Sequence, residues 1–211
     1  IKADIKPASK TGRNCDEAVS LMEPLLIGEG SRHRPNLTDL ALELAQRSSG
    51  FRRSLPQSLL VSLASLVRSM NCYYSNLIEG HDTHPIDIES ALHGEYSRDA
   101  KKCDLQMEAK AHIMVQQWID GGGLRGLTVT ADSIREIHRR FCEELPDDLL
   151  WALDPKTQER FKVIPGELRQ RDVAVGNPIP ISPAAVPRFL RRFAEVYGHL
   201  GKTETIIAAA A

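Results

Sequence analysis

The sequence has few cysteines, and they are widely spaced. Its four cysteines are Cys15, Cys72, Cys103 and Cys142, and none of them belongs to a C-x-x-C pair. This spacing is typical neither of a disulfide framework nor of a zinc site, which usually uses closely paired ligands. We therefore expect a reducing, cytoplasmic setting.

Long apolar runs and an excess of charge are also missing. No apolar stretch reaches the roughly 18 residues needed to span a bilayer, and no charged-then-apolar signal segment opens the chain. The 27 basic and 28 acidic residues give a net charge of −1, which argues against a broad nucleic-acid or anionic-membrane surface. We expect no membrane partner and no nucleic-acid partner for this segment, and we interpret Arg188, Arg191 and Arg192 as a solvated helix face.

Several signatures of catalytic and metal sites are absent as well. The sequence has no G-x-S-x-G nucleophile elbow and no phosphate-binding P-loop. His81, Asp82 and His84 form the loop sequence HDTH, with His93 downstream, and His and Asp are common metal ligands. No second cluster with ligand spacing accompanies them, so a turn explains them better and we expect no metal site. His138 lies on an apolar helix stripe, where we interpret it as a core or boundary histidine.

The sequence is rich in helical periodicity. The strongest signal covers 56–80, where Pro56 opens a run whose apolar residues recur every three or four positions up to Leu77. Thr130 reads as the N-cap of another helix, with a core stripe from Ile134 to Leu145. The expected helices cover about 37–48, 56–80, 85–93, 103–120, 130–145 and 182–200, with a last one from 203 onward.

The pattern changes at 158–181, where apolar and polar residues alternate in RDVAVG and Pro and Gly punctuate both sides. We predict a two-stranded hairpin there. The fold class expected from the whole pattern is all-α, a helical bundle with one small β-hairpin. An N-terminal arm and short helix over 1–54 precede the main domain over 55–211.

The helix over 56–80 ends with an acid in an unusual place, because Glu79 directly precedes Gly80. Glycine commonly stops helices, since it enters the left-handed conformation without steric cost. A carboxylate there faces the negative end of the helix dipole, which costs about 0.3–1 kcal/mol unless a cation offsets it. The pattern therefore indicates a missing Arg or Lys partner.

The stretch YSNLIEGH resembles the inhibitory helix of Fic (filamentation induced by cyclic AMP) domain proteins, whose pattern is Ser or Thr, three residues, Glu, then Gly or Asn. Ser75, Glu79 and Gly80 fill this pattern, and His81 stands where the family often has Asn. ADSIREIHRRF, PGELRQRDVAVG and IPISPAAVPRFLRRFAEVY are similar to the family's core helix, flap hairpin and next helix, in the same order. The resemblance covers the chain from about residue 55 to its end, with a flap at about 160–177.

The resemblance implies a protein adenylyltransferase, which moves AMP from ATP to a Tyr, Ser or Thr hydroxyl of a target protein and uses Mg²⁺. Glu79 would be the inhibitory glutamate, paired with an arginine of the catalytic motif that otherwise holds the γ-phosphate of ATP. A guanidinium binds carboxylate and phosphate in the same forked way, so the two compete for it. The flap would dock an extended target segment by strand addition. Its implied residues are Gly166, Arg169, Val173, Ala174 and Val175.

The family's catalytic signature, H-P-F-x-D/E-G-N-G-R, is not in the sequence. We expect it to follow Ala211 in a longer parent, and we expect the 211 residues, which open at Ile1, to be a fragment that is inactive alone. Two alternatives stay open: a non-catalytic Fic-like module for protein interaction or transcription regulation, and a relative that transfers another phosphate-containing group. The long helix and the lead-in could both contribute to a homodimer.

Overall fold

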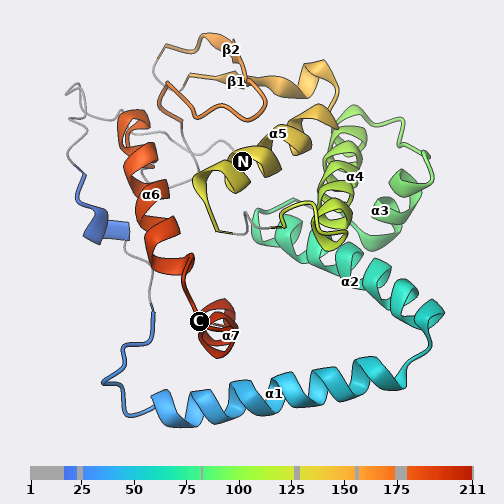
Figure 1. The fold of residues 1–211 in the computed structure, drawn as a ribbon. Helices are drawn as coiled ribbons and strands as arrows, with labels where there is room; N and C mark the ends of the chain where they lie inside the picture. The colour runs from blue at the N-terminus through green and yellow to red at the C-terminus, as the bar shows by residue number, and fades with distance from the viewer. Residues whose placement is uncertain are drawn as a thin grey trace.

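A computed structural model describes residues 17–22, 26–81, 83–125, 129–154, 157–173 and 180–210 of the chain. The described chain is mostly helical and carries one two-stranded antiparallel hairpin (Figure 1). This confirms the predicted all-α fold class with a small β-hairpin. Among the described helices, none combines the length and the apolar character that crossing a membrane requires.

The order of elements follows the sequence prediction closely, apart from the hairpin. Three short 3₁₀ turns, Val19–Met22, Asp147–Leu150 and Pro183–Ala185, accompany the longer elements. The helices are α1 (Arg34–Ser54), α2 (Gln57–Ile78), α3 (Pro85–Leu92), α4 (Ala100–Asp120), α5 (Ala131–Glu143), α6 (Val186–Tyr197) and α7 (Lys202–Ala210), and the strands are β1 (Trp151–Leu153) and β2 (Arg160–Lys162).

Helix α4 is the centre of the fold, because it contacts α2, α3 and α5 (Figure 1). The most deeply buried cluster joins α2, α3 and α4: it consists of Cys72 of α2, Ile88 of α3, and Ala109 and Ile113 of α4. All four side chains are 1% exposed or less, so the end of α2 is held in place by core packing.

Two helix boundaries show how local chemistry sets the elements. α5 begins with a reciprocal capping box, as the predicted N-cap requires: the Thr130 hydroxyl accepts the Ser133 N–H and the Ser133 hydroxyl accepts the Thr130 N–H, both at 3.0 Å. α1 was expected to end near Ser48 but continues through Gly50 to residue 54. Its end is set by Leu55, which is extended (φ −98°, ψ 140°) because a residue before proline avoids the helical region.

The hairpin lies upstream of its predicted position. β1 pairs with β2 so that Trp151 faces Lys162, and the prediction of a hairpin that begins at 158 is therefore wrong about the first strand. The turn is closed by Asp154, whose N–H donates to the Glu159 carbonyl at 2.9 Å and whose carboxylate accepts the Thr157 N–H at 3.1 Å. Residues 163–173 form no strand in the structure, and 174–179 lie outside the described residues.

The lead-in contacts the far end of the chain. The Glu17 carboxylate accepts both the N–H and the hydroxyl of Ser182, at 2.7 and 2.8 Å. Arg34, at the start of α1, forms an ion pair of 2.7 Å with Glu204 of α7. These contacts join the first described residues to the last two helices.

Candidate functional site

Helix α2 ends in a Schellman motif. The His81 N–H donates to the Asn76 carbonyl at 2.8 Å and the Gly80 N–H donates to the Leu77 carbonyl at 3.1 Å. Gly80 has φ +78°, the left-handed conformation that the motif requires and that favours glycine. Glu79 is the C-cap residue, so the backbone fixes where its side chain leaves the helix.

The predicted pair Ser75 and Glu79 lies together at this helix end. The Glu79 N–H donates to the Ser75 carbonyl at 3.2 Å, and the Glu79 side chain is exposed. Charged groups of α4 lie within electrostatic range of it. Burial raises the pKa of Glu108, and the nearby charges of Asp104 and Glu79 raise it further, against an opposing effect of His81.

The titratable groups of α4 that interact electrostatically with Glu79 are Glu108 and His112. Within the part of the chain that the structure describes, no Arg or Lys forms an ion pair with it. Arg68 of α2 pairs with Asp120 at 2.8 Å, and Lys102 of α4 pairs with Asp87 at 2.9 Å. The Arg or Lys partner that the sequence pattern indicated for Glu79 is therefore not found among the described residues.

A second candidate site is a groove of about 570 Å³ between α5, the hairpin, the segment after it and α6. Apolar walls from all four parts line it: Ile134, Phe161, Leu168, Val173 and Leu190. Its charged side chains are Arg135, Lys162, Glu167, Arg169 and Arg171. Three of these cations are paired with acids: Arg135 with Asp132 at 3.9 Å, Lys162 with Asp147 at 2.8 Å and Arg171 with Glu159 at 3.2 Å. The groove contains two of the predicted flap residues, Arg169 and Val173.

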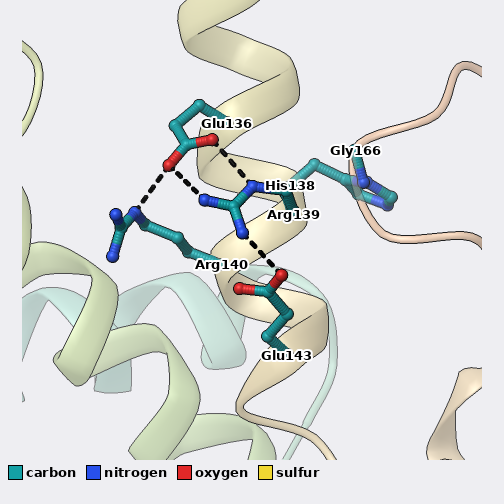
Figure 2. A network of polar contacts seen from close by, with 6 residues as sticks. All are labelled: Glu136, His138, Arg139, Arg140, Glu143 and Gly166. Atoms are coloured by element: carbon teal, nitrogen blue, oxygen red, sulfur yellow. Dashed lines mark hydrogen bonds and ion pairs between the residues drawn. The ribbon is translucent and has the colours of Figure 1, made fainter.

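Gly166 is an anchor of this groove. Its N–H donates to Nδ1 of His138 at 3.0 Å; the two residues are drawn in Figure 2. Its carbonyl accepts Nε–H of Arg135 at 2.8 Å. The residue is buried with φ +78°, and a Cβ there would lie 3.0 Å from Cβ of Arg139. Gly166 thus has a structural role in holding the segment on α5, and its docking role stays a prediction. His138, half-buried beside it, is a boundary histidine.

Arg169 braces the same segment. Its guanidinium donates to the Ile181 carbonyl and, at 3.1 Å, to the Arg171 carbonyl. This ties the predicted flap to the residues that lead into α6. Val173 is half-buried in the groove wall, whereas the predicted residues Ala174 and Val175 lie outside the described residues.

The arginines of α5 are engaged in a network on their own helix. Glu136 accepts hydrogen bonds from Arg139 and Arg140, and Arg139 also pairs with Glu143 at 2.6 Å (Figure 2). The hydrogen bond from Arg139, assisted by that from Arg140, lowers the pKa of Glu136 to about 2. The guanidinium of Arg140 also stacks over the Trp118 ring, 4.1 Å from its centroid, which fixes α5 on α4.

The described residues do not fit the cofactors that the resemblance implies. No group of three or more His, Cys, Asp or Glu among them could hold a metal ion. The Mg²⁺-binding acid and the phosphate-cradling glycines would belong to the catalytic motif, which this sequence does not contain. Binding of Mg²⁺ and ATP therefore stays an expectation that belongs to the catalytic motif.

No family model matches the chain, and no similar curated protein or solved structure was found. The resemblance to Fic proteins thus depends on the motifs in the sequence, and the site must be interpreted from its geometry.

Proposed function

We propose that this chain is the regulatory and target-docking part of a Fic-type protein adenylyltransferase, which transfers AMP from ATP to a Tyr, Ser or Thr hydroxyl of a target protein. Glu79 would hold the enzyme inactive. The observation that carries the proposal is an exposed C-cap carboxylate, rigidly placed by a Schellman motif and without an Arg or Lys partner among the described residues. A guanidinium bound there would be unavailable to a phosphate.

The surroundings of Glu79 favour such a guanidinium. Asp104 and Glu108 add negative charge on the side of α4. Burial lowers the pKa of His112, against an opposing effect of Glu79. Its Nε2 accepts a hydrogen bond from Gln116 at 2.7 Å, which only the neutral ring can do at that nitrogen, so the contact favours the uncharged ring over a cationic partner for Glu79. An arginine entering here would be attracted by more than one carboxylate, which strengthens inhibition.

The groove beside α5 supplies the docking part of the proposal. Its apolar walls suit an extended target segment that places apolar side chains next to the modified hydroxyl. ATP would supply the transferred AMP and Mg²⁺ would neutralise its phosphates, both held by residues of the catalytic motif. The residues of this chain control access and position the target.

The test is self-labelling by the full-length protein with α-labelled ATP. Glu79→Gly should increase labelling about tenfold to a hundredfold, the equivalent of losing one charge-assisted hydrogen bond. Glu144→Gly is the matched control, because Glu144 is the exposed C-cap residue of α5 with a similar backbone (φ −82°, ψ −11°). Equal labelling of the two variants, with unchanged circular dichroism, would contradict the inhibitory role of Glu79.

A second candidate, a non-catalytic interaction module, is favoured by a different observation. A groove of about 630 Å³ runs between α1, α2 and α4 and is lined by apolar side chains that include Phe51, Leu63, Val67 and Ile119. Phe51 and Val67 are more than half exposed, at 62% and 55%. An amphipathic helix of a partner, with acidic residues beside Arg52, would fit it. Absent labelling in Glu79→Gly, together with no ATP binding by calorimetry, would favour this candidate.

A further inference from the structure

Gly166 is held against α5 through both of its backbone polar groups; Figure 2 shows it beside His138. One of the two partners, Arg135, is permanently charged, but the other, Nδ1 of His138, is not. An imidazole nitrogen can accept a hydrogen bond only while it carries a lone pair. The contact at 3.0 Å therefore depends on the protonation state of one ring.

We propose that His138 is a positioning residue that, as the neutral ring, fixes the segment 166–173 on α5, and that protonation of the ring releases this segment. Since the Gly166 N–H donates to Nδ1, the proton of the neutral ring is on Nε2, which lies 3.5 Å from Sγ of Cys142. A second proton, on Nδ1, would place two donors face to face and break the bond to Gly166.

The environment of His138 favours the neutral ring. Cys142 carries no charge to balance an imidazolium, because burial raises the pKa of its thiol. α6 presents only the uncharged Val186 and Leu190 to the groove, and burial lowers the pKa of His138 below its ordinary value of 6.5. The charged groups that border the groove are Arg135 of α5, Lys162 of β2, and Glu167, Arg169 and Arg171 of the following segment. Arg135, Lys162 and Arg171 are paired with Asp132, Asp147 and Glu159, so these acids already have cationic partners. The anchor is thus closed at neutral pH and opens in acid.

The consequence concerns target docking. The anchored segment contains Arg169 and Val173, so its release would move two groove residues at once. The anchor stands on the geometry alone, whereas its effect on docking rests on the proposed function. Acid would then slow target labelling by disordering the docking edge rather than by changing nucleotide chemistry.

The first experiment is an NMR titration of the 211-residue chain between pH 8 and pH 5. The ring signals of His138 and the amide signal of Gly166 should change with the same midpoint, below 6.5. The exchange of the Gly166 amide, corrected for its intrinsic pH dependence, should accelerate about tenfold across that midpoint, as expected for one lost hydrogen bond. A Gly166 amide that stays protected and unshifted while His138 titrates would overturn the proposal.

Two variants separate positioning from simple packing. His138→Phe removes the acceptor and should give fast Gly166 exchange at every pH. His138→Asn keeps an oxygen acceptor near the position of Nδ1 but does not titrate, so exchange should stay slow down to pH 5. Fast exchange in His138→Asn at neutral pH would contradict the proposal even if His138→Phe fails to fold.

A labelling experiment connects the anchor to function. In the full-length protein carrying Glu79→Gly, target labelling should fall with acid, and the additional change His138→Asn should remove that fall. No labelling at any pH would overturn the proposed function but leave the NMR result standing. Labelling with the same pH profile in both proteins would overturn the role of His138 in docking.

Discussion

The ends of α2 and α3 share a backbone and differ in their side chains. Both close with a left-handed glycine, Gly80 at φ +78° and Gly94 at φ +80°. The C-cap residue is Glu79 in α2 and His93 in α3. Nδ1 of His93 lies 2.9 Å from the Glu89 carbonyl and donates to it, because a carbonyl can only accept.

The comparison shows that this helix stop does not need an acid. In α3 the C-cap side chain donates to a carbonyl of the last helical turn. Cationic and donor side chains are favourable at a helix C-terminus for this reason. The carboxylate of Glu79 cannot donate to a carbonyl and stands exposed at the negative end of α2. Local structure therefore gives no reason for this acid, and a partner from elsewhere does.

The largest expected effect on stability comes from a third helix end, that of α4. This helix also ends at glycines, but here they are tightly packed. A Cβ on Gly123 would lie 2.0 Å from Cε2 of Trp118, so the ring would have to move. Gly123→Ala should lower the free energy of unfolding by about 3 kcal/mol, as overpacking does. Urea denaturation checks this, with Gly121→Ala as the control, since a Cβ there approaches only backbone oxygens at 3.4 Å. Equal losses in the two variants would contradict the packing argument.

A smaller effect tests whether the α2 and α3 ends are equivalent. A Cβ on Gly80 or Gly94 would meet nothing within 4 Å, so only the left-handed backbone opposes a side chain there. Gly80→Ala and Gly94→Ala should each cost about 1–2 kcal/mol. Gly50→Ala, at an open position inside α1, should instead stabilise by about 0.5–1 kcal/mol. Clearly unequal losses at 80 and 94 would show that the two stops are not alike.

The charge difference between the two ends should be smaller still. Glu79→Gln should raise the free energy of unfolding by about 0.5 kcal/mol at low salt, because it removes a charge that the helix dipole and Glu108 both oppose. His93→Glu should lower it by about 1 kcal/mol, since a donor is lost and an unfavourable charge is added. The gain at 79 should fade in 1 M salt, where the screening length is about 3 Å. A Glu79→Gln variant less stable than the parent would mean that the Glu79 carboxylate stabilises the fold.

The smallest effect is a pH dependence near α2. Burial lowers the pKa of His112 below its ordinary value of 6.5, so the unfolded chain binds a proton more readily than the folded one. The stability contributed by the neutral ring is complete above pH 6.5 and is lost as the pH falls toward the lowered pKa. His112→Gln should flatten the stability curve between pH 7 and pH 5, whereas His199→Gln, at an exposed position, should leave it unchanged. Parallel curves for all three proteins would contradict the assignment.

The helices were predictable because their signals are local. Pro56 and Gly80 bracket the prediction of 56–80, and α2 covers Gln57–Ile78. Thr130 caps α5 as expected. The extension of α1 beyond Ser48 was missed because Ser and Gly weaken a helix without ending it, whereas proline restricts the residue before it.

The hairpin was predicted in the wrong place because an alternating pattern of apolar and polar residues indicates a strand but does not show which segment pairs with it. RDVAVG alternates, yet β2 pairs with the three residues of β1, which lie upstream beyond the six residues that begin at Asp154. A turn signal, Asp-Pro-Lys-Thr between WAL and RFK, was available in the sequence. It would have favoured the observed pairing.

The candidate site also has a part that could be predicted from the sequence and a part that could not. Ser75, Glu79 and Gly80 are neighbours in sequence, so their joint position at a helix end followed from spacing. The contact between His138 and Gly166 crosses 28 positions and depends on how the segment after β2 packs on α5. A histidine on a helix and a glycine after a proline give no hint that they pair.

The two hydrogen bonds between Glu17 and Ser182 also bear on the order of events during synthesis. They close a loop of 165 residues. At a translation rate of about 5–20 residues per second, the arm waits roughly 8–33 seconds for Ser182 to be made. Helices α2 to α5 can pack during that interval, since their contacts are complete long before. The contact of the lead-in with Ser182 can therefore form only after α2 to α5 have been made, although the lead-in is made before them.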